Sequence, residues 1–451
     1  MATMVPKKVI VKKGYSLTLS GEPSATLQKA SNPETVGVLP SEIPFIKPKA
    51  LVKEGDAVHI GTPLFLDKHD PRVQFLSPAA GVVDRVVLGE RRRLEEIVVR
   101  VAAEEKAVSF QKYEATAIAT TPREQLVAAL LERGVWPLLR ERPFGRIPSP
   151  DVVPPSVYVS LDAEDAFLPQ SQVVLEGNEA YLRAGIAALS VLTSGAVSVA
   201  LHASSAILKT SLKDVVTHQI SGDTTANSPE VFHYHAKQSA SENTAWTLGA
   251  SEVIRLGESL LEGQYPVRQV ITVSGIMTSS NGHFLTRVGA PVSLFLKEAS
   301  AARYVAGSVM TGRKVSHSGY LGLDEAALVA LPEGQEQQFL SFVQPGFDKY
   351  SFSKAFLSAL LPKKAWTLPT TVNGSHRACI ECGACVEVCP VDLLPQLILK
   401  QVEAQDQEES IALGMLDCTA CGLCTYVCPS KIEVADTITE AKNKVFKELR
   451  S

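Results

Sequence analysis

All eight cysteines of this chain lie near its C-terminus, in two copies of one spacing pattern. Each copy reads C-x-x-C-x-x-C-x-x-x-C-P, with Pro390 and Pro429 directly after the fourth cysteine. Thiolates at this spacing ligate cubane iron–sulfur clusters in bacterial proteins. Three of them wrap one corner of a [4Fe-4S] cube, and the fourth reaches the neighbouring cube before the proline turns the chain away. The pattern therefore predicts a protein that carries single electrons.

The cross-ligation rule assigns each cysteine to one of two predicted clusters. The first set is Cys379, Cys382, Cys385 and Cys428. The second set is Cys418, Cys421, Cys424 and Cys389. A four-cysteine zinc site is the main alternative, but it would leave the third cysteine of each run unused. Disulfides are disfavoured, because a chain that lacks a secretory signal and clusters its cysteines in this way is typical of the reducing cytoplasm.

Composition indicates a globular protein of several domains. The chain has 451 residues, enough for roughly three or four domains. Its hydrophobic fraction is 45%, and its net charge of −4 gives no support for nucleic-acid binding. The lysine-rich start, from Lys7 to Lys13, predicts a strand rather than a signal peptide. The uncharged stretch Ala184 to Leu208 is too rich in polar residues for a lipid-exposed helix, so we expect a buried helix, then the strand Ala196 to Leu201, and no transmembrane helix.

Short strands broken by Gly and Pro fill the region from Val9 to Val101, and this region resembles the barrel-sandwich fold of biotinyl and lipoyl carriers. In such carriers a hairpin tip displays the modified lysine. Here the equivalent position is held by Asp70, with Lys68 close by, so that a scaffold role is favoured over a carrier role. We predict a barrel-sandwich hybrid domain over residues 1–105.

Strands and helices alternate through the middle of the chain. A helix over Gln125 to Leu139, a strand over Ser156 to Leu161 and a helix over Glu179 to Leu189 predict a Rossmann-like α/β domain over residues 110–262. No G-x-G-x-x-G follows any of these strands. Strands at Val270 to Val273 and Val292 to Leu296 then predict a β-grasp-like, SLBB-type module over residues 263–335.

The remainder is predicted to be a connector, residues 336–370, followed by a helical ferredoxin-like dicluster domain, residues 371–451. The connector includes the mixed segment Ser341 to Ala365. Helices are expected at Leu393 to Glu403, Ser410 to Leu416 and Val434 to Leu449. The predicted fold class is thus an α/β and α+β multidomain chain.

A few other residues could do chemistry. His233 and His235 flank Tyr234 in a strand-like stretch that would place both imidazoles on one face, where they could bind a metal, although hydrogen-bonded structural histidines are the more common case. His376 and Arg377 precede the first cysteine run and could tune a cluster. Arg91-Arg92-Arg93 reads as a hairpin tip.

Several phrases along the chain together resemble the A subunits of the sodium-translocating NADH:quinone oxidoreductases. They are Gly55-Asp56, Ser77-Pro78-Ala79-Ala80-Gly81, Trp136-Pro137, Arg142-Pro143-Phe144, His233-Tyr234-His235, Thr311-Gly312-Arg313 and Leu321-Gly322. The cysteine segment, with Asp392-Leu393-Leu394-Pro395, instead resembles the C subunit of the related Rnf complex. Many A subunits have lost most of these cysteines, whereas this chain keeps both runs.

The resemblance implies a peripheral subunit on the cytoplasmic side of the inner membrane. Its implied partners are integral-membrane and flavin subunits of such a complex, with a quinone as a candidate ligand. The glycine-rich loop that seats FMN and NADH in Rnf C subunits is missing, since the region before Ser156 reads Gly145-Arg146-Ile147-Pro148-Ser149-Pro150, which argues against FMN or NADH on this chain.

The favoured hypothesis is a relay of single electrons through two [4Fe-4S] clusters within an ion-translocating NADH:quinone oxidoreductase, with no acid–base catalyst on this chain. One alternative is an Rnf-type C subunit that oxidises NADH on FMN and exchanges electrons with ferredoxin. The other is a non-catalytic scaffold whose clusters only stabilise the fold.

Overall fold

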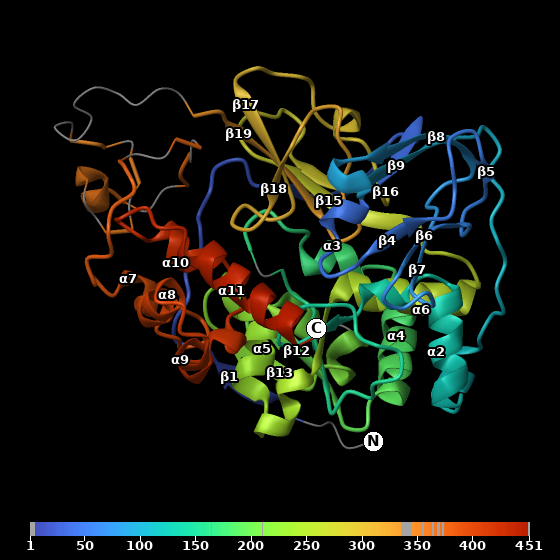
Figure 1. Cartoon of the computed structure of the whole chain (residues 1–451), viewed down its shortest axis with the longest axis horizontal. Helices are drawn as coiled ribbons and strands as arrows, with labels where there is room; N and C mark the ends of the chain where they lie inside the picture. The colour runs from blue at the N-terminus through green and yellow to red at the C-terminus, as the bar shows by residue number, and fades with distance from the viewer. Residues whose placement is uncertain are drawn as a thin grey trace.

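The computed structural model describes residues 5–163, 165–209, 211–334, 345–347, 349–350, 352–353, 356–362, 365–367, 370–371 and 374–449. About half of the predicted connector, including Ser341, lies outside the described residues. Figure 1 shows three β-containing regions and a helical C-terminal region that lies beside the central sheet.

A six-stranded sheet forms the centre of the molecule, in the order β1-β13-β12-β11-β14-β10. Its strands are β1 (Lys7–Ile10), β13 (His218–Ser221), β12 (Val197–His202), β11 (Val157–Ser160), β14 (Trp246–Gly249) and β10 (Arg140–Glu141). All neighbours are parallel except β10, which runs antiparallel to β14 at the edge. Every residue of β11 is buried, as expected for a parallel strand covered on both faces. The predicted layered α/β domain and its strands at Ser156 to Leu161 and Ala196 to Leu201 are confirmed.

Helices cover both faces of this sheet. The helices of the α/β region are α1 (Ala115–Ile118), α2 (Arg123–Glu132), α3 (Ser171–Leu175), α4 (Glu179–Leu192), α5 (Pro229–Ala236) and α6 (Ala250–Glu262). Helices α4 and α6 pack closely because glycines meet at their contact: a Cβ on Gly257 would lie 1.9 Å from the Tyr181 carbonyl oxygen, and one on Gly185 would lie 2.1 Å from that of Val253. The helix predicted over Gln125 to Leu139 is shorter than expected, because a 3-10 turn at Trp136–Leu138 replaces its second half.

Two small antiparallel sheets follow in the N-terminal region. One has the order β3-β9-β8-β5, formed by β3 (Thr35–Val38), β9 (Leu94–Val101), β8 (Gly81–Leu88) and β5 (Ala57–Val58). The other has the order β4-β6-β7, formed by β4 (Pro48–Ala50), β6 (Pro63–Asp67) and β7 (Gln74–Leu76). The rings of Phe65 and Phe75 stack between β6 and β7, with centroids 4.4 Å apart. The short strands predicted from Val9 to Val101 are therefore confirmed.

A third, mixed sheet has the order β18-β17-β19-β15-β16-β2. Its strands are β18 (Arg313–Val315), β17 (Ala302–Ala306), β19 (Ala327–Pro332), β15 (Arg268–Ser274), β16 (Gly282–Arg287) and β2 (Ser24–Lys29). The strand predicted at Val292 to Leu296 is wrong: Val292–Leu294 is a 3-10 turn that follows Pro291, whose fixed φ suits a turn start.

Two strands within the first thirty residues pair with sheets other than the two small antiparallel ones. Strand β1 pairs with β13 in the central sheet, and β2 pairs with β16 in the third sheet. The N-terminal segment thus belongs to two other sheets before the chain enters the small antiparallel sheets.

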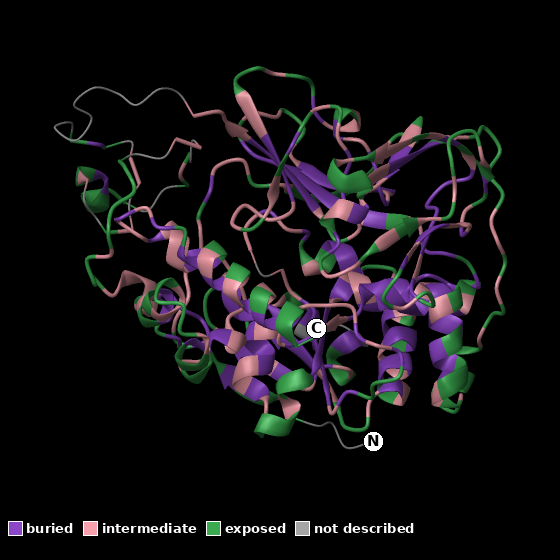
Figure 2. Cartoon of the chain, viewed as in Figure 1, coloured by how far each residue is buried: buried purple, intermediate pink, exposed green. Residues whose placement is uncertain are grey.

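The C-terminal region is helical. Its helices are α7 (Ala384–Glu387), α8 (Pro395–Glu403), α9 (Gln407–Ala412), α10 (Leu423–Tyr426) and α11 (Val434–Glu448). One hydrophobic cluster joins this region to the central sheet, since Val9, Ile220 and Phe232 pack in it together with Val391 and Ile438. Figure 2 shows that buried residues fill the central strands. In the part of the chain that the structure describes, no helix is both long enough and apolar enough to cross a membrane.

Candidate iron–sulfur centre

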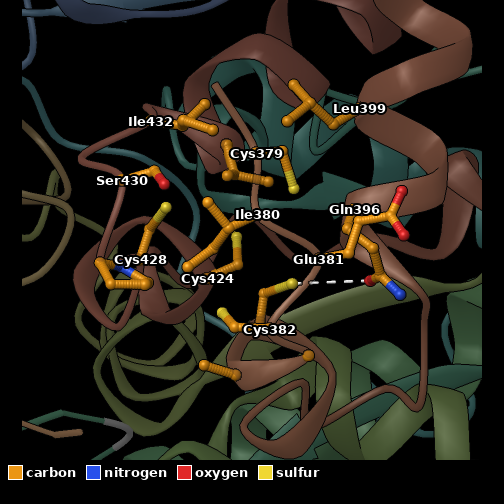
Figure 3. Close-up of a pocket in the computed structure, with 15 residues that line it drawn as sticks. Cys379, Ile380, Glu381, Cys382, Gln396, Leu399, Cys424, Cys428, Ser430 and Ile432 are labelled. Atoms are coloured by element: carbon orange, nitrogen blue, oxygen red, sulfur yellow. Dashed lines mark hydrogen bonds between the residues drawn. The ribbon is translucent and has the colours of Figure 1, made fainter. Parts of the chain in front are cut away.

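The four cysteines of the first set come together at one pocket. Cys379, Cys382, Cys385 and Cys428 all line it, although Cys428 comes from the second cysteine run. Figure 3 labels Cys379, Cys382 and Cys428 around this pocket. Cys424 of the second set also borders this pocket, so the two sets are neighbours. Apolar side chains fill much of the remaining wall: Ile380, Leu399, Ile432 and Val434. The Cys385 thiol donates a hydrogen bond to Gln396 Oε1 at 3.5 Å.

The two cysteine runs have the same backbone conformation. Left-handed residues recur at three pairs of equivalent positions, each pair being 39 residues apart like the cysteines themselves. The pairs are Glu381 and Ala420, Gly383 and Gly422, and Asp392 and Lys431, with φ between 52° and 79°. Alternation of left-handed with right-handed residues turns successive N–H groups toward one side, which forms the anion-binding concavity found around many iron–sulfur sites. The Ala420 N–H already points at sulfur, 3.4 Å from Cys418 Sγ.

The second set lies deeper in the protein than the first. Cys389 is buried, whereas Cys382 is exposed. Burial raises the pKa of Cys389 to about 11 and that of Cys421 to about 12, and it raises the pKa of Cys424 well above the usual range. These thiols therefore stay protonated in the absence of a positive partner, so that iron binding must release their protons.

Three cationic side chains, two of them buried, lie around the loop of Cys418. Arg142, directly after β10, donates from Nη2 to the carbonyl oxygens of Asp417 at 3.1 Å and Cys418 at 3.4 Å. Lys442 of α11 donates to the same Cys418 oxygen at 2.6 Å, and Lys237, directly after α5, forms an ion pair of 3.0 Å with Asp417. Burial lowers the pKa of Arg142, and burial followed by the charge of Arg142 lowers the pKa of Lys442 to about 8.

The two predicted strand histidines lie in a helix instead. His233 and His235 belong to α5, where residues two apart face different directions, so the shared face expected for a metal site is wrong. His233 Nε2 donates to the Glu242 carbonyl at 2.8 Å, and burial lowers its pKa to about 4. His235 Nε2 donates to the Pro390 carbonyl at 2.7 Å, which ties α5 to the end of the first cysteine run.

The other residues that the sequence pointed to lie at the surface. Asp70 binds Arg72 at 2.7 Å in the β6–β7 hairpin. Arg91 and Arg92 form the tip between β8 and β9, as predicted. Arg377 lies beside the first set, where its N–H donates to the Ser430 carbonyl at 2.9 Å. Among the described residues, no three His, Cys, Asp or Glu side chains gather closely enough to bind a single metal ion.

A second cavity, of about 470 Å³, opens at the carboxyl ends of β11 and β14. Because β12 and β14 lie on opposite sides of β11, this is the switch point where open α/β sheets bind ligands. Its wall is strongly acidic, with a single arginine, Arg313, among the lining residues that the structure describes. The carboxylates that line it are Glu42, Asp162, Glu230, Glu252, Asp324 and Glu325. Arg140 pairs with Asp324, and Arg313 pairs with Glu42 and Glu325, so part of this negative charge is compensated. The carboxylates that remain disfavour a ligand with phosphate groups, such as FMN or NADH.

Comparison with known proteins matches three parts of the chain to family models. Residues 9–102 match a model described as the NqrA N-terminal barrel-sandwich hybrid domain, and residues 121–265 match the NqrA second alpha/beta domain. Residues 378–432 match a 4Fe-4S dicluster domain. Fold and site therefore define a multidomain protein in which a dicluster domain is joined to a barrel-sandwich and an α/β domain.

Whole-chain relatives narrow that class. The A subunit of the Na(+)-translocating NADH-quinone reductase of Alcanivorax borkumensis is 33% identical over 412 residues, which is 90% of this chain and 92% of that protein. The protein of the same name from Vibrio parahaemolyticus is 31% identical over 448 residues, 98% of this chain and 100% of that protein. The chain belongs to the family of Na(+)-translocating NADH-quinone reductase A subunits. The resemblance of its cysteine segment to the Rnf C subunit stays a prediction.

Proposed function

We propose that this chain is a peripheral subunit of a membrane-bound, ion-translocating NADH:quinone oxidoreductase and relays single electrons through two [4Fe-4S] clusters. The repeated backbone of the two cysteine runs is the observation that supports it most directly, because it offers the same concavity twice. The relatives' shared name supports the complex and its sodium translocation. The first and second sets, as assigned above, are the proposed ligands.

When bound, each cluster supplies one-electron chemistry at a potential that the protein tunes by hydrogen bonds, charge and burial. The chain contributes eight thiol ligands, backbone N–H groups around them and, at the more deeply buried second set, packed surroundings that exclude water. The exposed position of Cys382 makes the first set the side accessible to a redox partner. Because a hydride carries two electrons, a flavin subunit is the proposed partner that divides the pair.

The remaining assignments follow from the same proposal. We infer integral-membrane and flavin subunits as partners, a cytoplasmic-side location, and a quinone as a candidate ligand. The parallel central sheet supports a Rossmann-like domain, and the mixed third sheet supports a β-grasp-like module. The acidic wall of the second cavity supports the view that FMN and NADH bind elsewhere in the complex.

An anaerobic titration of the purified chain tests the proposal. We expect about eight iron atoms per chain, no flavin, and two iron–sulfur EPR signals that dithionite generates but NADH does not. Stoichiometric flavin with reduction by NADH would instead identify the Rnf-type activity. To test relay against scaffold, Cys→Ser variants are assembled into the complete complex: a relay loses quinone reduction, whereas a scaffold keeps it wherever the variant chain still assembles.

The cross-ligation assignment has its own test. Cys428→Ser should alter the EPR signal of the first cluster, and Cys389→Ser that of the second, because each cysteine is proposed to serve the set built by the other run. If each variant changed the signal of its own run, the assignment would be wrong while the two-cluster proposal remained.

A further inference from the structure

The surroundings of the two cysteine sets differ most in charge and burial. The first set is open to solvent at Cys382, and its neighbour Ile380 is 67% exposed. The second set lies against the α/β domain, where the Cys418 loop contacts Arg142 and Lys442. Solvent therefore screens charges near the first set, while charges near the second set act through protein.

The cationic side chains of Arg142 and Lys442 both donate hydrogen bonds to one main-chain oxygen, the carbonyl oxygen of Cys418. They reach the Cys418 carbonyl oxygen from different parts of the chain, Arg142 from the end of β10 and Lys442 from α11. Each of these two residues is only 6% exposed. Their hydrogen bonds go to main-chain oxygens, which carry no formal charge and so leave the cationic charge uncompensated.

The other charged groups around this loop nearly balance. Lys237 pairs with Asp417 at 3.0 Å, and Lys13 pairs with Asp392 at 3.0 Å near Cys389. Glu230 of α5 is the remaining carboxylate that acts on both Arg142 and Lys442 among the described residues. Once these pairs are set aside, two buried cations face one carboxylate, so the second set lies in a net positive environment.

The first set has a matched lysine in a different setting. Lys400 of α8 acts on Cys379, but its side chain is 46% exposed and it is paired with Glu381. Its charge is therefore both neutralised and screened. This contrast separates the effect of a buried cation from the effect of any nearby lysine.

We propose that Arg142 and Lys442 together raise the reduction potential of the second cluster and so favour transfer of the electron inward from the exposed first cluster. This rests on the proposed function, since it requires both clusters. An added electron makes a cluster more negative, and a buried site disfavours that added charge unless cations lie close by. The two residues offset this penalty by stabilising the reduced form, and Arg142 does so at every relevant pH because guanidinium does not lose its proton.

EPR-monitored redox titration of the full chain tests this proposal with charge-removing and charge-keeping variants. Cys421→Ser, which alters a ligand of the second set, first assigns the two signals. Arg142→Met should shift the midpoint potential of the second cluster to more negative values and leave that of the first unchanged. Lys442→Met should shift the second potential in the same direction, whereas Arg142→Lys should retain most of the unsubstituted value. Lys400→Met, the matched control, should move neither potential appreciably.

The outcomes distinguish this inference from the function on which it rests. If the unsubstituted chain does not hold two clusters, the proposed function fails before any variant is compared. If two clusters assemble in Arg142→Met and Lys442→Met with unchanged potentials, the inference is overturned and the relay stands. If Arg142→Met does not assemble its second cluster, the midpoint potentials of Lys442→Met and Arg142→Lys test the inference in its place. A shift in Lys400→Met equal to that in Lys442→Met would also overturn the role given to burial.

Discussion

Single residues determine the backbone conformation of the cysteine loops and the contacts between these loops and the α/β domain. Each run needs a left-handed residue directly after its second cysteine, supplied by Gly383 or Gly422. The cysteine sets could be predicted from the sequence, because the spacing within each run is local. The contact of Arg142 with Cys418 could not be predicted, because the two residues lie 276 positions apart in the sequence. The motif that contains Arg142 indicated only a family resemblance.

Gly383→Ala and Gly422→Ala form a matched pair that separates backbone strain from crowding. A Cβ at Gly383 meets nothing within 4 Å, so its cost is the left-handed conformation alone, about 1 kcal/mol. At Gly422 the Cβ would also lie 3.1 Å from the Met310 carbonyl oxygen, so we expect a larger loss in the free energy of unfolding. Urea unfolding with simultaneous cluster absorbance measures both, and equal losses would show that the Met310 contact is irrelevant.

His233 should make stability depend on pH. Burial holds its folded pKa at about 4, below the ordinary value of 6.5, so the unfolded chain takes up the proton first as pH falls. The free energy of unfolding keeps its full value from this residue above pH 6.5. It falls progressively toward pH 4, by on the order of 3 kcal/mol. Urea unfolding at several pH values measures the slope. His233→Gln keeps a donor for Glu242 and should flatten the slope; a variant with the original slope would exclude His233 as its source.

At the scale of elements, α11 fastens the cluster region to the rest of the molecule. Phe446 packs its ring against Phe45 at 4.5 Å and Phe144 at 5.0 Å, which come from the N-terminal and α/β regions. Amphipathic periodicity predicted α11, and the alternation of strand-like with helix-like segments predicted β11 and β12. The α5 helix was missed although Ser228-Pro229-Glu230 is a helix-start signature, because the flanking aromatics and histidines suggested a strand.

Phe446→Ala should therefore loosen the cluster region. Removal of a buried ring costs about 3 kcal/mol, and here the loss falls on a contact between regions. Hydrogen exchange of α11 should accelerate, and the clusters should bleach faster in air. Leu449→Ala lies one turn on and removes a side chain that is 73% exposed, so it should leave both measurements unchanged. Similar effects from the two variants would contradict this role for Phe446.

The whole molecule is held together by close backbone contacts between sheets that are distant in sequence. Gly37 of β3 lies against Tyr320, where any Cβ would be 2.3 Å from the ring carbon Cγ, and its N–H bonds to the Gly289 carbonyl at 2.9 Å. The types of domain could be predicted from local patterns. The pairing of β1 and β2 with strands of other sheets could not be predicted. Their partner strands lie far along the chain, and the sequence of a strand does not specify which strand it pairs with.

Gly37→Ala should separate the N-terminal region from the third sheet. The added Cβ would clash with Tyr320 at Cγ, where the ring is attached to the side chain, so the whole ring would have to move. Overpacking of this kind typically costs about 1–3 kcal/mol of stability. Gly322→Ala is the control, since its Cβ would meet only the flexible end of Glu325 at 3.2 Å. Thermal unfolding should lose cooperativity in Gly37→Ala alone. A single unshifted transition in both variants would show that this contact does not couple the two regions.

The path of the first thirty residues has a consequence for how a ribosome delivers this chain. Lys7 pairs with His218 and Ser24 with Gly282, so both strands leave the exit tunnel long before their partners exist. At about 5–20 residues per second the wait is roughly ten to fifty seconds. During that time the backbone N–H and C=O groups of both strands are unpaired, and we expect the charges of Lys7, Lys8 and Lys29 to oppose pairing with neighbouring nascent chains.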